Sequence, residues 1–536
     1  MNQIITLTIL LSCMLNLGLS QNLEYNNAEK FDFKSVSYDN NTGFDNPAII
    51  CNHLNALSDF DIDFDPMGIL SSSIFFFEDN KISYSGTFYG ESEVNLKDVS
   101  FNKTTEHETI LLQLKGPCNF ISSDGEELNF DFPKLEKMSG IIDFSKEDGV
   151  DTYWTSHFIW DDFRYQKLWN AGDLTLISGA LLDSLIYINP DNSKITLLGS
   201  SVYNACVIAI DENGFYKWSY ISEGGQYISI VEHNNEIVIS HDRLLKSKLI
   251  HLDKDGNELK VTPVLLGLVI LKVDFDEMDN MFICGMYNQN APDTNIDLNE
   301  GEYFLEYESG NGIDAYLIKY DSEGNLEWAQ TITGSEYDSA INFDFNGDYI
   351  YLTGGILEDA VFDKIGENMT EFQVDEFSNA YISKYHKDGT MEWVELFENE
   401  DICNGLDIDV DADGLSIFGS FRGEFDANPN SENTELLFMD NPGNSRSHFH
   451  VQLTEKTSSI LNTPESGRLL MPNPVSFYLS TLKPNDKIIY IKDFTACTIG
   501  NYNSNIVDVS ILPDGMYIVT IESNGKIQSQ LVSIIH

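Results

Sequence analysis

The chain has 536 residues, of which 42% are hydrophobic and 12% aromatic, and its formal net charge is −55. This hydrophobic content excludes a disordered chain, and the charge argues against a nucleic-acid partner, because phosphate binding needs clustered Lys and Arg. The length allows several cores or one large β architecture. Asn, Asp, Gly, Ser, Tyr and Phe are plentiful, which is typical of short strands joined by tight turns.

The first segment has the pattern of a signal peptide. Residues 4–17 are largely apolar and carry no charge, and small residues follow up to Ser20. Because this run is shorter than the roughly 20 residues of a membrane-spanning helix, we expect residues 1–20 to direct export and to be removed. Leu10–Cys13 resembles a lipoprotein box, so lipidation of that cysteine is the alternative. The sequence predicts no transmembrane segment in the mature chain.

A hairpin pattern recurs in the middle of the chain. Each copy has an apolar run, a polar turn that ends in Gly, and a second run that reaches a Trp: the copies are 204–218, 314–328 and 379–393. A fainter copy at 247–256 has lost the Trp. Polar turns between strand-like runs predict β-hairpins. Since Trp218, Trp328 and Trp393 share one repeat position, we expect them to pack between neighbouring repeats.

A second hairpin pattern alternates with the first. Its leading strand mixes apolar and acidic residues, in copies at 272–285, 341–354 and 406–421, with a related segment at 60–68 followed by 82–86. Two hairpins give four antiparallel strands, which is one blade of a β-propeller. The copies suggest about six blades, with room for a degenerate seventh between Gly86 and Gly199. Longer steps between copies predict inserted loops, such as 424–444, between successive units.

The sequence therefore predicts an all-β fold, in which a β-propeller of about six to seven four-stranded blades occupies residues 21–453. Residues 314–328 and 347–354 resemble bacterial propeller repeats that read Asp-Ala, an apolar pair, a variable residue, Lys and, after a Gly turn, Trp. The resemblance implies the propeller fold. It implies little about activity, because propellers include both binding proteins and enzymes.

An acidic run imitates the start of a calcium-binding loop: Asp407, Asp409, Asp411 and Asp413, followed by Gly414. Ser420 stands where an EF-hand needs its closing Glu. The alternation of apolar residues predicts instead a strand with Asp407 and Asp409 on its solvent face, followed by a turn. The structural turn is the favoured interpretation, and Ca²⁺ is the one cofactor candidate, with ligands Asp409, Asp411 and Asp413.

No catalytic motif is found: the chain lacks HExxH, GxSxG, P-loop and dinucleotide-binding glycine patterns, and catalytic residues stay unassigned. His448 and His450 share one strand face without a third ligand, so we expect a solvated pair. No CxxC spacing supports a thiolate zinc site. Cys206 and Cys284 lie in apolar, strand-like runs, which predicts buried thiols.

The end of the chain differs in character. A polar stretch at 454–469 predicts a linker, and a compact β unit follows at 470–536. This unit resembles the C-terminal sorting domain of type IX secretion in Bacteroidetes, on these residues: Pro472, Asn473, Pro474, Asp508, Ser510, Leu512, Gly515 and Tyr517. The resemblance implies a small β-sandwich, the type IX machinery as a partner, and a location outside or on the outer membrane of a Gram-negative cell. An ordinary β-sandwich is the alternative.

Two functions from different classes fit these features. The first is a secreted or cell-surface propeller that binds a glycan or a protein, or has a structural role. The second is a secreted polysaccharide-active hydrolase or lyase that uses carboxylates as acid and base. The lack of a catalytic motif favours the first. A ligand is expected at the mouth of the propeller axis or on the long loops.

Overall fold

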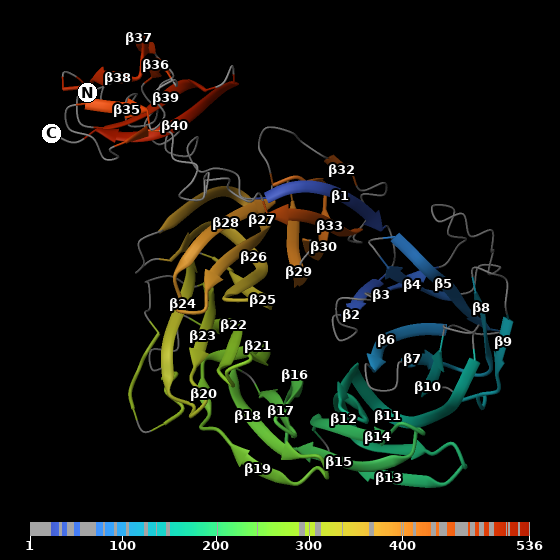
Figure 1. Ribbon diagram of the computed structural model, residues 1–536. Helices are drawn as coiled ribbons and strands as arrows, with labels where there is room; N and C mark the ends of the chain where they lie inside the picture. Colours follow the sequence, from blue (N-terminus) through green and yellow to red (C-terminus); the bar gives the residue numbers. More distant parts are fainter. Residues whose placement is uncertain are drawn as a thin grey trace. The chain divides into compact units, whose positions relative to one another are not determined.

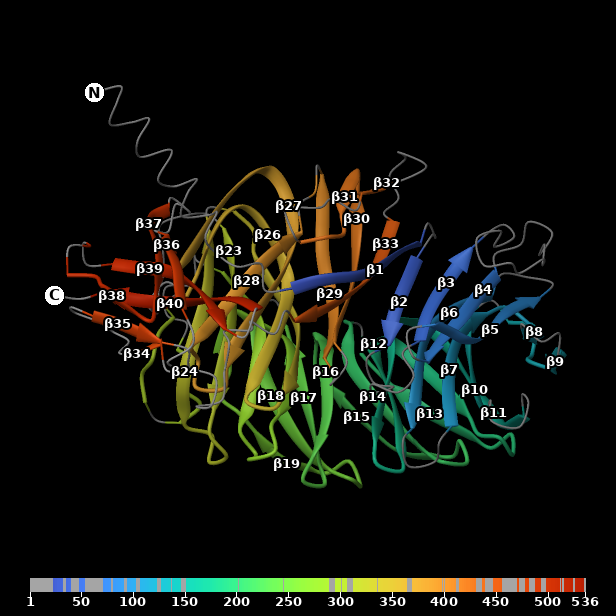
Figure 2. The same ribbon diagram turned by 45° about the horizontal axis from the view of Figure 1, so that its top comes forward.

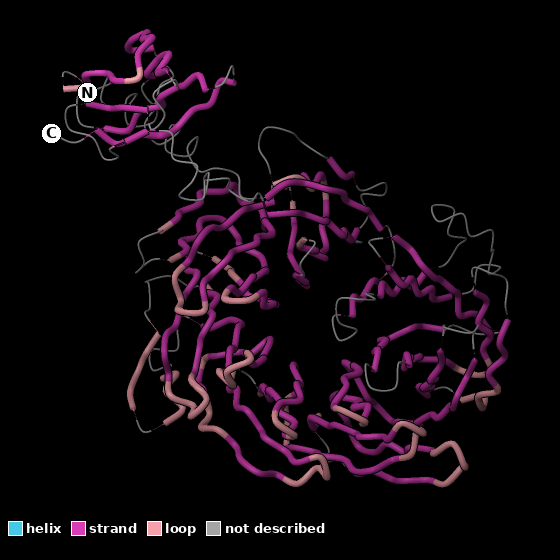
Figure 3. Tube along the Cα trace, viewed as in Figure 1, coloured by secondary structure: helices cyan, strands magenta, loops and turns pink. Residues whose placement is uncertain are grey.

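The computed structural model describes residues between 23 and 534, with gaps of which the longest are 40–47, 54–70, 439–446 and 456–469. The chain divides into two compact units, Met1–Glu455 and Lys456–His536. Every regular element among the described residues is a β-strand (Figure 3), which confirms the predicted all-β class. Among these residues there is no helix with the length and apolarity that a membrane span requires.

The first unit is a ring of antiparallel sheets, the arrangement of a β-propeller (Figure 1). Seen after a 45° turn, its strands run steeply along the axis of the ring (Figure 2). The clearest blades consist of four consecutive strands: β16 (Gln226–His233), β17 (Glu236–Asp242), β18 (Lys246–Asp253) and β19 (Glu258–Val261); β21 (Leu268–Phe275), β22 (Met281–Asn288), β23 (Ile313–Tyr320) and β24 (Leu326–Gly334); and β25 (Ser339–Asn346), β26 (Tyr349–Phe362), β27 (Thr370–His386) and β28 (Met391–Phe397). These strands contain the predicted hairpins at 272–285, 314–328, 341–354 and 379–393.

Two further groups share a pair of long strands, β11 (Asp151–Ala171) and β12 (Leu174–Ile188). The first part of β11 completes a group with β6 (Val94–Asn102), β7 (His107–Leu114) and β10 (Met138–Ser145). Its second part begins the next group, with β12, β14 (Asn204–Asp211) and β15 (Tyr216–Ser222). The sheet before them has the order β2 (Ser35–Asp39), β3 (Ala48–His53), β4 (Ser71–Glu78), β5 (Lys81–Gly90), β8 (Cys118–Ser122) and β9 (Glu127–Phe130). The predicted segment 60–68 lies outside the described residues.

A strand from the start of the chain closes the ring. The last group consists of β29 (Ile402–Val410), β30 (Leu415–Arg422), β33 (Ser447–Glu455) and β1 (Leu23–Phe31). Its outermost strand, β1, pairs antiparallel with β33, with Leu23 opposite Glu455 and Phe31 opposite His448. The first and last strands of this unit therefore form one sheet, although almost the whole unit lies between them in sequence.

Insertions leave the blades between their second and third strands. The 424–444 segment lies between β30 and β33 and contains the hairpin of β31 (Glu424–Asp426) and β32 (Leu436–Phe438). The sequence had suggested a loop between successive units. The segment lies instead inside a blade. The β8–β9 hairpin and β13 (Lys194–Leu198) occupy the same place in their groups. Because second strands all run in one direction along the axis, these insertions emerge on one face of the ring.

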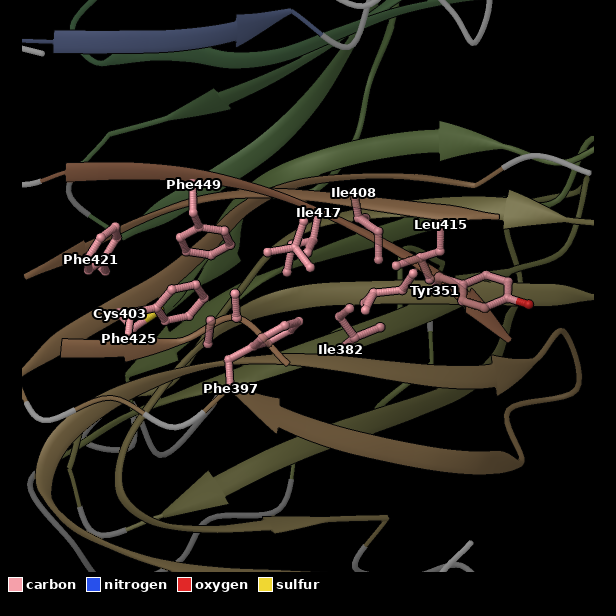
Figure 4. Packing of buried hydrophobic residues seen from close by; sticks show 14 of the residues in the cluster. Tyr351, Ile382, Phe397, Cys403, Ile408, Leu415, Ile417, Phe421, Phe425 and Phe449 are labelled. Carbon is pink, nitrogen blue, oxygen red and sulfur yellow. The ribbon is translucent and has the colours of Figure 1, made fainter. Parts of the chain in front are cut away.

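The hydrophobic core lies between adjacent blades. Between the last two, buried aliphatic and aromatic side chains from both sheets interlock (Figure 4), and they include Tyr351, Ile382, Phe397, Ile408, Ile417 and Phe449. Alternating strands make this possible, because each sheet presents an apolar face to the blade on either side. Similar clusters fill the other described junctions.

Tryptophans on the outer strands fasten one blade to the next. The Trp218 indole N–H donates to the Lys254 carbonyl of the following blade at 2.7 Å, and its ring lies against Gly256, where a Cβ would come within 2.5 Å of the indole. Trp328 meets the Lys387 carbonyl and Gly389 in the same way, at 3.1 Å. This confirms that the repeated tryptophans pack between blades. Each turn glycine also has a positive φ, which favours Gly.

A fourth tryptophan makes the same contact without having been recognised in the repeats. The Trp154 indole N–H donates to the Glu212 carbonyl at 2.7 Å, and its ring lies beneath Gly214. Trp154 belongs to the degenerate group, whose sequence has diverged from the other copies. We call this contact, an indole under the turn glycine of the next blade, the tryptophan staple.

The first residue of the first repeat pattern holds the end of its hairpin. Asp314 Oδ1 accepts the backbone N–H of Gly334 at 3.3 Å, and Asn379 Oδ1 accepts that of Asn399 at 3.0 Å. Both side chains are buried, so these bonds satisfy polar groups that would be costly to leave unpaired. The repeated Asp or Asn is therefore structural.

The second unit contains two small sheets. One has β34 (Leu470–Met471), β35 (Tyr478–Thr481) and β38 (Ile506–Asp508), and the other has β37 (Thr498–Ser504), β36 (Lys487–Lys492), β39 (Gly515–Ser523) and β40 (Lys526–Ile534). Among the sorting-motif residues, Leu512 and Tyr517 are buried, and Ser510 is exposed in the turn after β38. Asp508 ends β38 and Gly515 begins β39, whereas Pro472, Asn473 and Pro474 lie outside the described residues.

Removing one staple tests its contribution to stability. Trp218→Ala is expected to lower the free energy of unfolding by about 3–5 kcal/mol, because it leaves a cavity between two blades. Trp218→Phe keeps most of the packing and loses the N–H donor, so a loss of about 1–2 kcal/mol is expected. Urea denaturation of both variants provides the measurement. Equal losses for the two substitutions would show that the hydrogen bond, and not the ring, dominates.

Candidate ligand site on the ring axis

Six of the inner strands share a local irregularity that the hairpin patterns did not reveal. The inner strands of the ring include β2, β6, β11, β16, β21, β25 and β29 (Figure 1). All of these except β2, whose pairing with β3 is regular, contain a β-bulge. In β6, β11, β16, β21, β25 and β29 the pairing resumes after the bulge at a polar residue: Asp98, Lys167, Ser229, Lys272, Asn342 and Asp407, respectively. A bulge adds residues to one strand and re-aims the side chains that follow. The same device therefore places a polar residue on each of these strands.

Side chains on the inner strands bond to the next inner strand around the ring. Asp98 Oδ2 accepts the backbone N–H of Leu168 at 2.7 Å. Ser229 Oγ accepts that of Val273 at 3.2 Å. These bonds satisfy backbone donors that face a neighbouring blade and not a ladder partner. They also link the bulged segments of adjacent blades.

The last three inner strands are joined through a mixed set of charges. Lys272 Nζ donates to the Phe343 carbonyl at 2.7 Å, Asn342 Nδ2 donates to Asp407 Oδ1, and Asp344 Oδ2 accepts the Val410 N–H at 2.8 Å. Burial raises the pKa of Asp344, and the ammonium group of Lys272 opposes that shift.

Charged groups from distant blades influence the pKa of Asp407. Burial raises the pKa of Asp407 to about 7, while Lys272 and Lys167 oppose the shift and Asp344 adds to it. Burial also raises the pKa of Asp98 to about 6, opposed by Lys167. Lys167 therefore acts on carboxyls from the blade before it and from the last blade of the ring. We call this set the axial polar cluster: Asp98, Lys167, Lys272, Asn342, Asp344 and Asp407.

The cluster combines groups that can donate and accept hydrogen bonds with one exposed cation. Lys167 is exposed, and Lys272 and Asn342 are half-buried. Asp407 and Asp98 are buried, and near neutral pH each can exist with or without its proton. The arrangement can bind polar groups of a ligand, and it offers carboxyls whose pKa suits proton transfer.

The prediction that Asp407 lies on the solvent face of its strand is wrong. Asp407 is buried, because the bulge between Gly405 and Asp407 interrupts the alternation that the sequence suggested. Asp409 is half-buried, and Asp411 and Asp413 lie outside the described residues. Within the described part of the chain, no three His, Cys, Asp or Glu side chains gather closely enough to hold a metal ion.

A related turn shows how such aspartates are used. Asp276 Oδ1 accepts the N–H groups of Met278 and Asn280, both at 2.9 Å, and Asp276 Oδ2 accepts the Asn280 amide at 3.0 Å. Side-chain bonds of this kind stabilise a turn. The carboxylate is thus occupied by its own loop, in agreement with the structural interpretation of this turn.

His450 and the two predicted cysteines are core residues. His450 is buried, so the expectation of a solvated pair is wrong for it, and burial lowers its pKa to about 4. His448 stacks on Phe418, with ring centroids 5.9 Å apart. Cys206 and Cys284 are free, buried thiols, as predicted. Burial raises the pKa of both to about 12.

Sequence reasoning missed the axial polar cluster, although one signal was present. Lys272, Asn342 and Asp407 occupy the same position in the second hairpin pattern, and all three are polar. The charge at that position differs from copy to copy, which indicates that these residues do more than pack in the core. Asp98 and Lys167 lie in degenerate copies, where the pattern gave no alignment.

Comparisons with known proteins add little beyond the fold. No protein-family model matches the chain, and no curated protein matches it. Similar solved structures include the Dos1 propeller (10% identity, covering 62% of this chain and 93% of that one, TM-score 0.29), the AfRom2 CNH domain (5%, 67% and 94%, TM-score 0.30) and a cobalt-substituted Synechocystis ACO (8%, 81% and 95%, TM-score 0.32). Scores this low carry no information on what this chain binds. The propeller fold rests on the strand pairing and on the ring of sheets.

Asp407 should make stability depend on pH. Because burial raises the folded pKa of Asp407 to about 7, above its ordinary value of 3.8, the folded chain keeps this proton to higher pH than the unfolded chain. The free energy of unfolding therefore falls as pH rises from about 4 to about 7. Above pH 7, Asp407 causes no further change in it. Asp407→Asn should be neutral at pH 4 and stabilising by up to about 4 kcal/mol at pH 8. Denaturant melts at both pH values test this, and an equal effect at both would contradict it.

Proposed function

We propose that this protein is a secreted or cell-surface β-propeller that binds an extracellular glycan or protein at the axial polar cluster. The convergence of that cluster on the axis carries the proposal. Five inner strands contribute to it, and two of the few lysines of a chain with a net charge of −55 are placed there. Propellers commonly bind ligands where their inner strands and loops converge.

The mixture of groups favours a ligand rich in hydroxyl or amide groups. Lys167 can donate to ligand oxygens, while Asp407 and Asp98 can accept from hydroxyls or, when protonated, donate to them. A polyanion is disfavoured, because the acidic surface of the chain repels it at long range. The inserted segments, which emerge on one face of the ring, would extend such a site beyond the axis.

A specific observation keeps the enzymatic alternative open. Burial raises the pKa of Asp407 to about 7 and that of Asp98 to about 6, values that suit a general acid in polysaccharide hydrolysis or elimination. In that case Asp407 is the candidate proton donor. Its activity would fall above pH 7 and would be abolished in Asp407→Asn, whereas at a pure binding site this substitution would only weaken binding.

We further propose a seven-bladed ring and export by type IX secretion. Seven blades follow if the sheet that begins at β2 supplies the first and the group closed by β1 supplies the last. The signal-like residues 1–20 and the motif in residues 470–536 support export, and the buried Leu512 and Tyr517 are consistent with a folded sorting unit.

Charge reversal at the axis tests the binding site. Lys167→Glu should weaken binding to a neutral polysaccharide panel of laminarin, xylan and dextran by about tenfold for whichever member the wild type retains. Lys217→Glu is the matched control, because Lys217 is half-exposed on the outer strand β15, away from the axis. Affinity gel electrophoresis measures retention. Equal retention of both variants would place the binding site elsewhere.

Removing the second unit tests the export route. A chain ending at residue 469 should fold its propeller and accumulate in the periplasm of a host that has type IX secretion, because the proposed sorting signal is gone. Fractionation and immunoblotting locate the chain, and the full-length protein is the control. Unchanged delivery of the shortened chain to the surface or the medium would rule out a sorting role for residues 470–536.

A further inference from the structure

Two buried aspartates meet where the blade of β21–β24 joins the blade of β25–β28. Asp314 lies in β23 and Asp338 directly precedes β25, and both residues are fully buried. Asp314 is paired with Tyr287 of β22, whose hydroxyl donates to its carboxylate. Burial, together with the negative charges of Asp314 and Asp359, raises the pKa of Asp338 well above its ordinary value. The carboxyl groups are therefore close enough to repel each other.

The fold does not need an acidic residue at either position. Asn379 stands in the next blade where Asp314 stands in this one, and it makes the same bond to the end of its hairpin. Asp338 and Cys403 stand at the same distance before the bulge of their inner strands. The next junction thus uses an amide and a buried thiol. Two buried carboxyls at this junction therefore have a role other than packing.

Two buried oxygen atoms at this junction have no hydrogen-bond partner among the described residues: Asp338 Oδ2 and Thr333 Oγ1. The two residues are 0% and 1% exposed. In β24, Thr331 lies opposite Tyr316 of β23, so Thr333 and Asp314, two positions further along, share one face of the sheet. A buried oxygen without a partner is costly. The threonine hydroxyl is an observation independent of the acidic pair, and it indicates a ligand at the same place.

A glycine lets the oxygens of this junction come together. A Cβ on Gly334 would lie 2.1 Å from the Asp359 carbonyl oxygen and 2.8 Å from Asp338 Oδ2, so any other residue would displace both atoms. Gly334 is not among the glycines with positive φ, and the backbone conformation therefore does not explain it. The close approach of the two oxygens does.

The donor set determines which ligand fits. The junction offers two carboxylates, one hydroxyl and one backbone carbonyl, all of them oxygen donors. Ca²⁺ takes about six to eight oxygen ligands in flexible geometry, and carbonyl and water oxygens complete its shell where carboxylates are few. Its double charge balances two buried carboxylates. Mg²⁺ fits less well, because it demands near-octahedral geometry and keeps several waters.

We propose that Asp314 and Asp338 bind a calcium ion, with Thr333 Oγ1 and the Asp359 carbonyl as further ligands. The ion ties β23 and β24 of one blade to the start of β25 and to β26 of the next. It is distinct from the acidic turn that begins at Asp409. None of its ligands belongs to the axial polar cluster, so the site does not depend on the proposed function.

Calcium binding to the full-length chain tests this site. The chain is first freed of divalent ions with EDTA and then titrated with Ca²⁺ by calorimetry, in physiological salt and excess Mg²⁺, which suppress weak binding to the acidic surface. The wild type should bind one ion with a dissociation constant below about 1 mM, and its melting temperature should rise. Asp338→Asn should weaken binding by about tenfold or more and lose this rise, because an amide does not balance the charge of the ion.

Three comparisons separate binding from folding. Glu336→Gln is the matched control, because this exposed side chain belongs to the same connection between blades, and it should bind calcium like the wild type. Asp314→Asn keeps an acceptor for the Gly334 N–H and should also lose the ion. In EDTA both Asn variants should melt at or above the wild-type temperature, since each removes a buried charge. The proposal is overturned if the wild type shows no saturable binding, in which case the carboxyls share a proton, or if both Asn variants retain the ion.

Discussion

The packing of an indole beneath the turn of the next blade is the constraint on which the ring depends. Each sheet has two apolar faces, so no blade is stable alone, and its faces must be covered by neighbours on both sides. The core clusters supply this cover near the middle of the blades, and the staples of Trp154, Trp218 and Trp328 supply it at the outer edge of three junctions. Trp218 joins packing and a hydrogen bond to Lys254 in one side chain. The turn glycine is needed both for its positive φ and because any Cβ would strike the ring.

A second constraint comes from charge. With a net charge of −55, the chain repels itself, and inward-facing carboxylates add a desolvation cost. The structure offsets part of this near the axis, where Lys272 and Lys167 oppose the shift that burial imposes on Asp407. The blades follow the same principle, since the buried Lys319 pairs with Glu327 at 2.7 Å. Cations are few in this chain, and those that are buried are placed beside carboxylates or aromatic rings.

The sequence predicted the parts of this structure that repeat. Polar turns with a glycine located the hairpins, and the shared position of Trp218 and Trp328 indicated contact between blades. The sequence did not predict the bulges, because one extra residue in a strand leaves no recognisable pattern. For this reason Asp407 was expected on the solvent face. The closure of the ring by β1 was also missed, because pairing between segments distant in sequence leaves no local pattern. The axial polar cluster depends on both features, which is why its members could not be grouped from the sequence.

The pairing of β1 with β33 sets the order of events in folding. Leu23 and Glu455 are neighbours in space, so the ring closes through the contact of longest range in the unit, and the entropic cost of that loop is paid at a single step. Such high contact order slows folding. Until β33 has been synthesised, β1 has no partner, and the blade that the two strands share stays incomplete. The ring of a nascent chain would therefore stay open until the last strand of this unit has been synthesised.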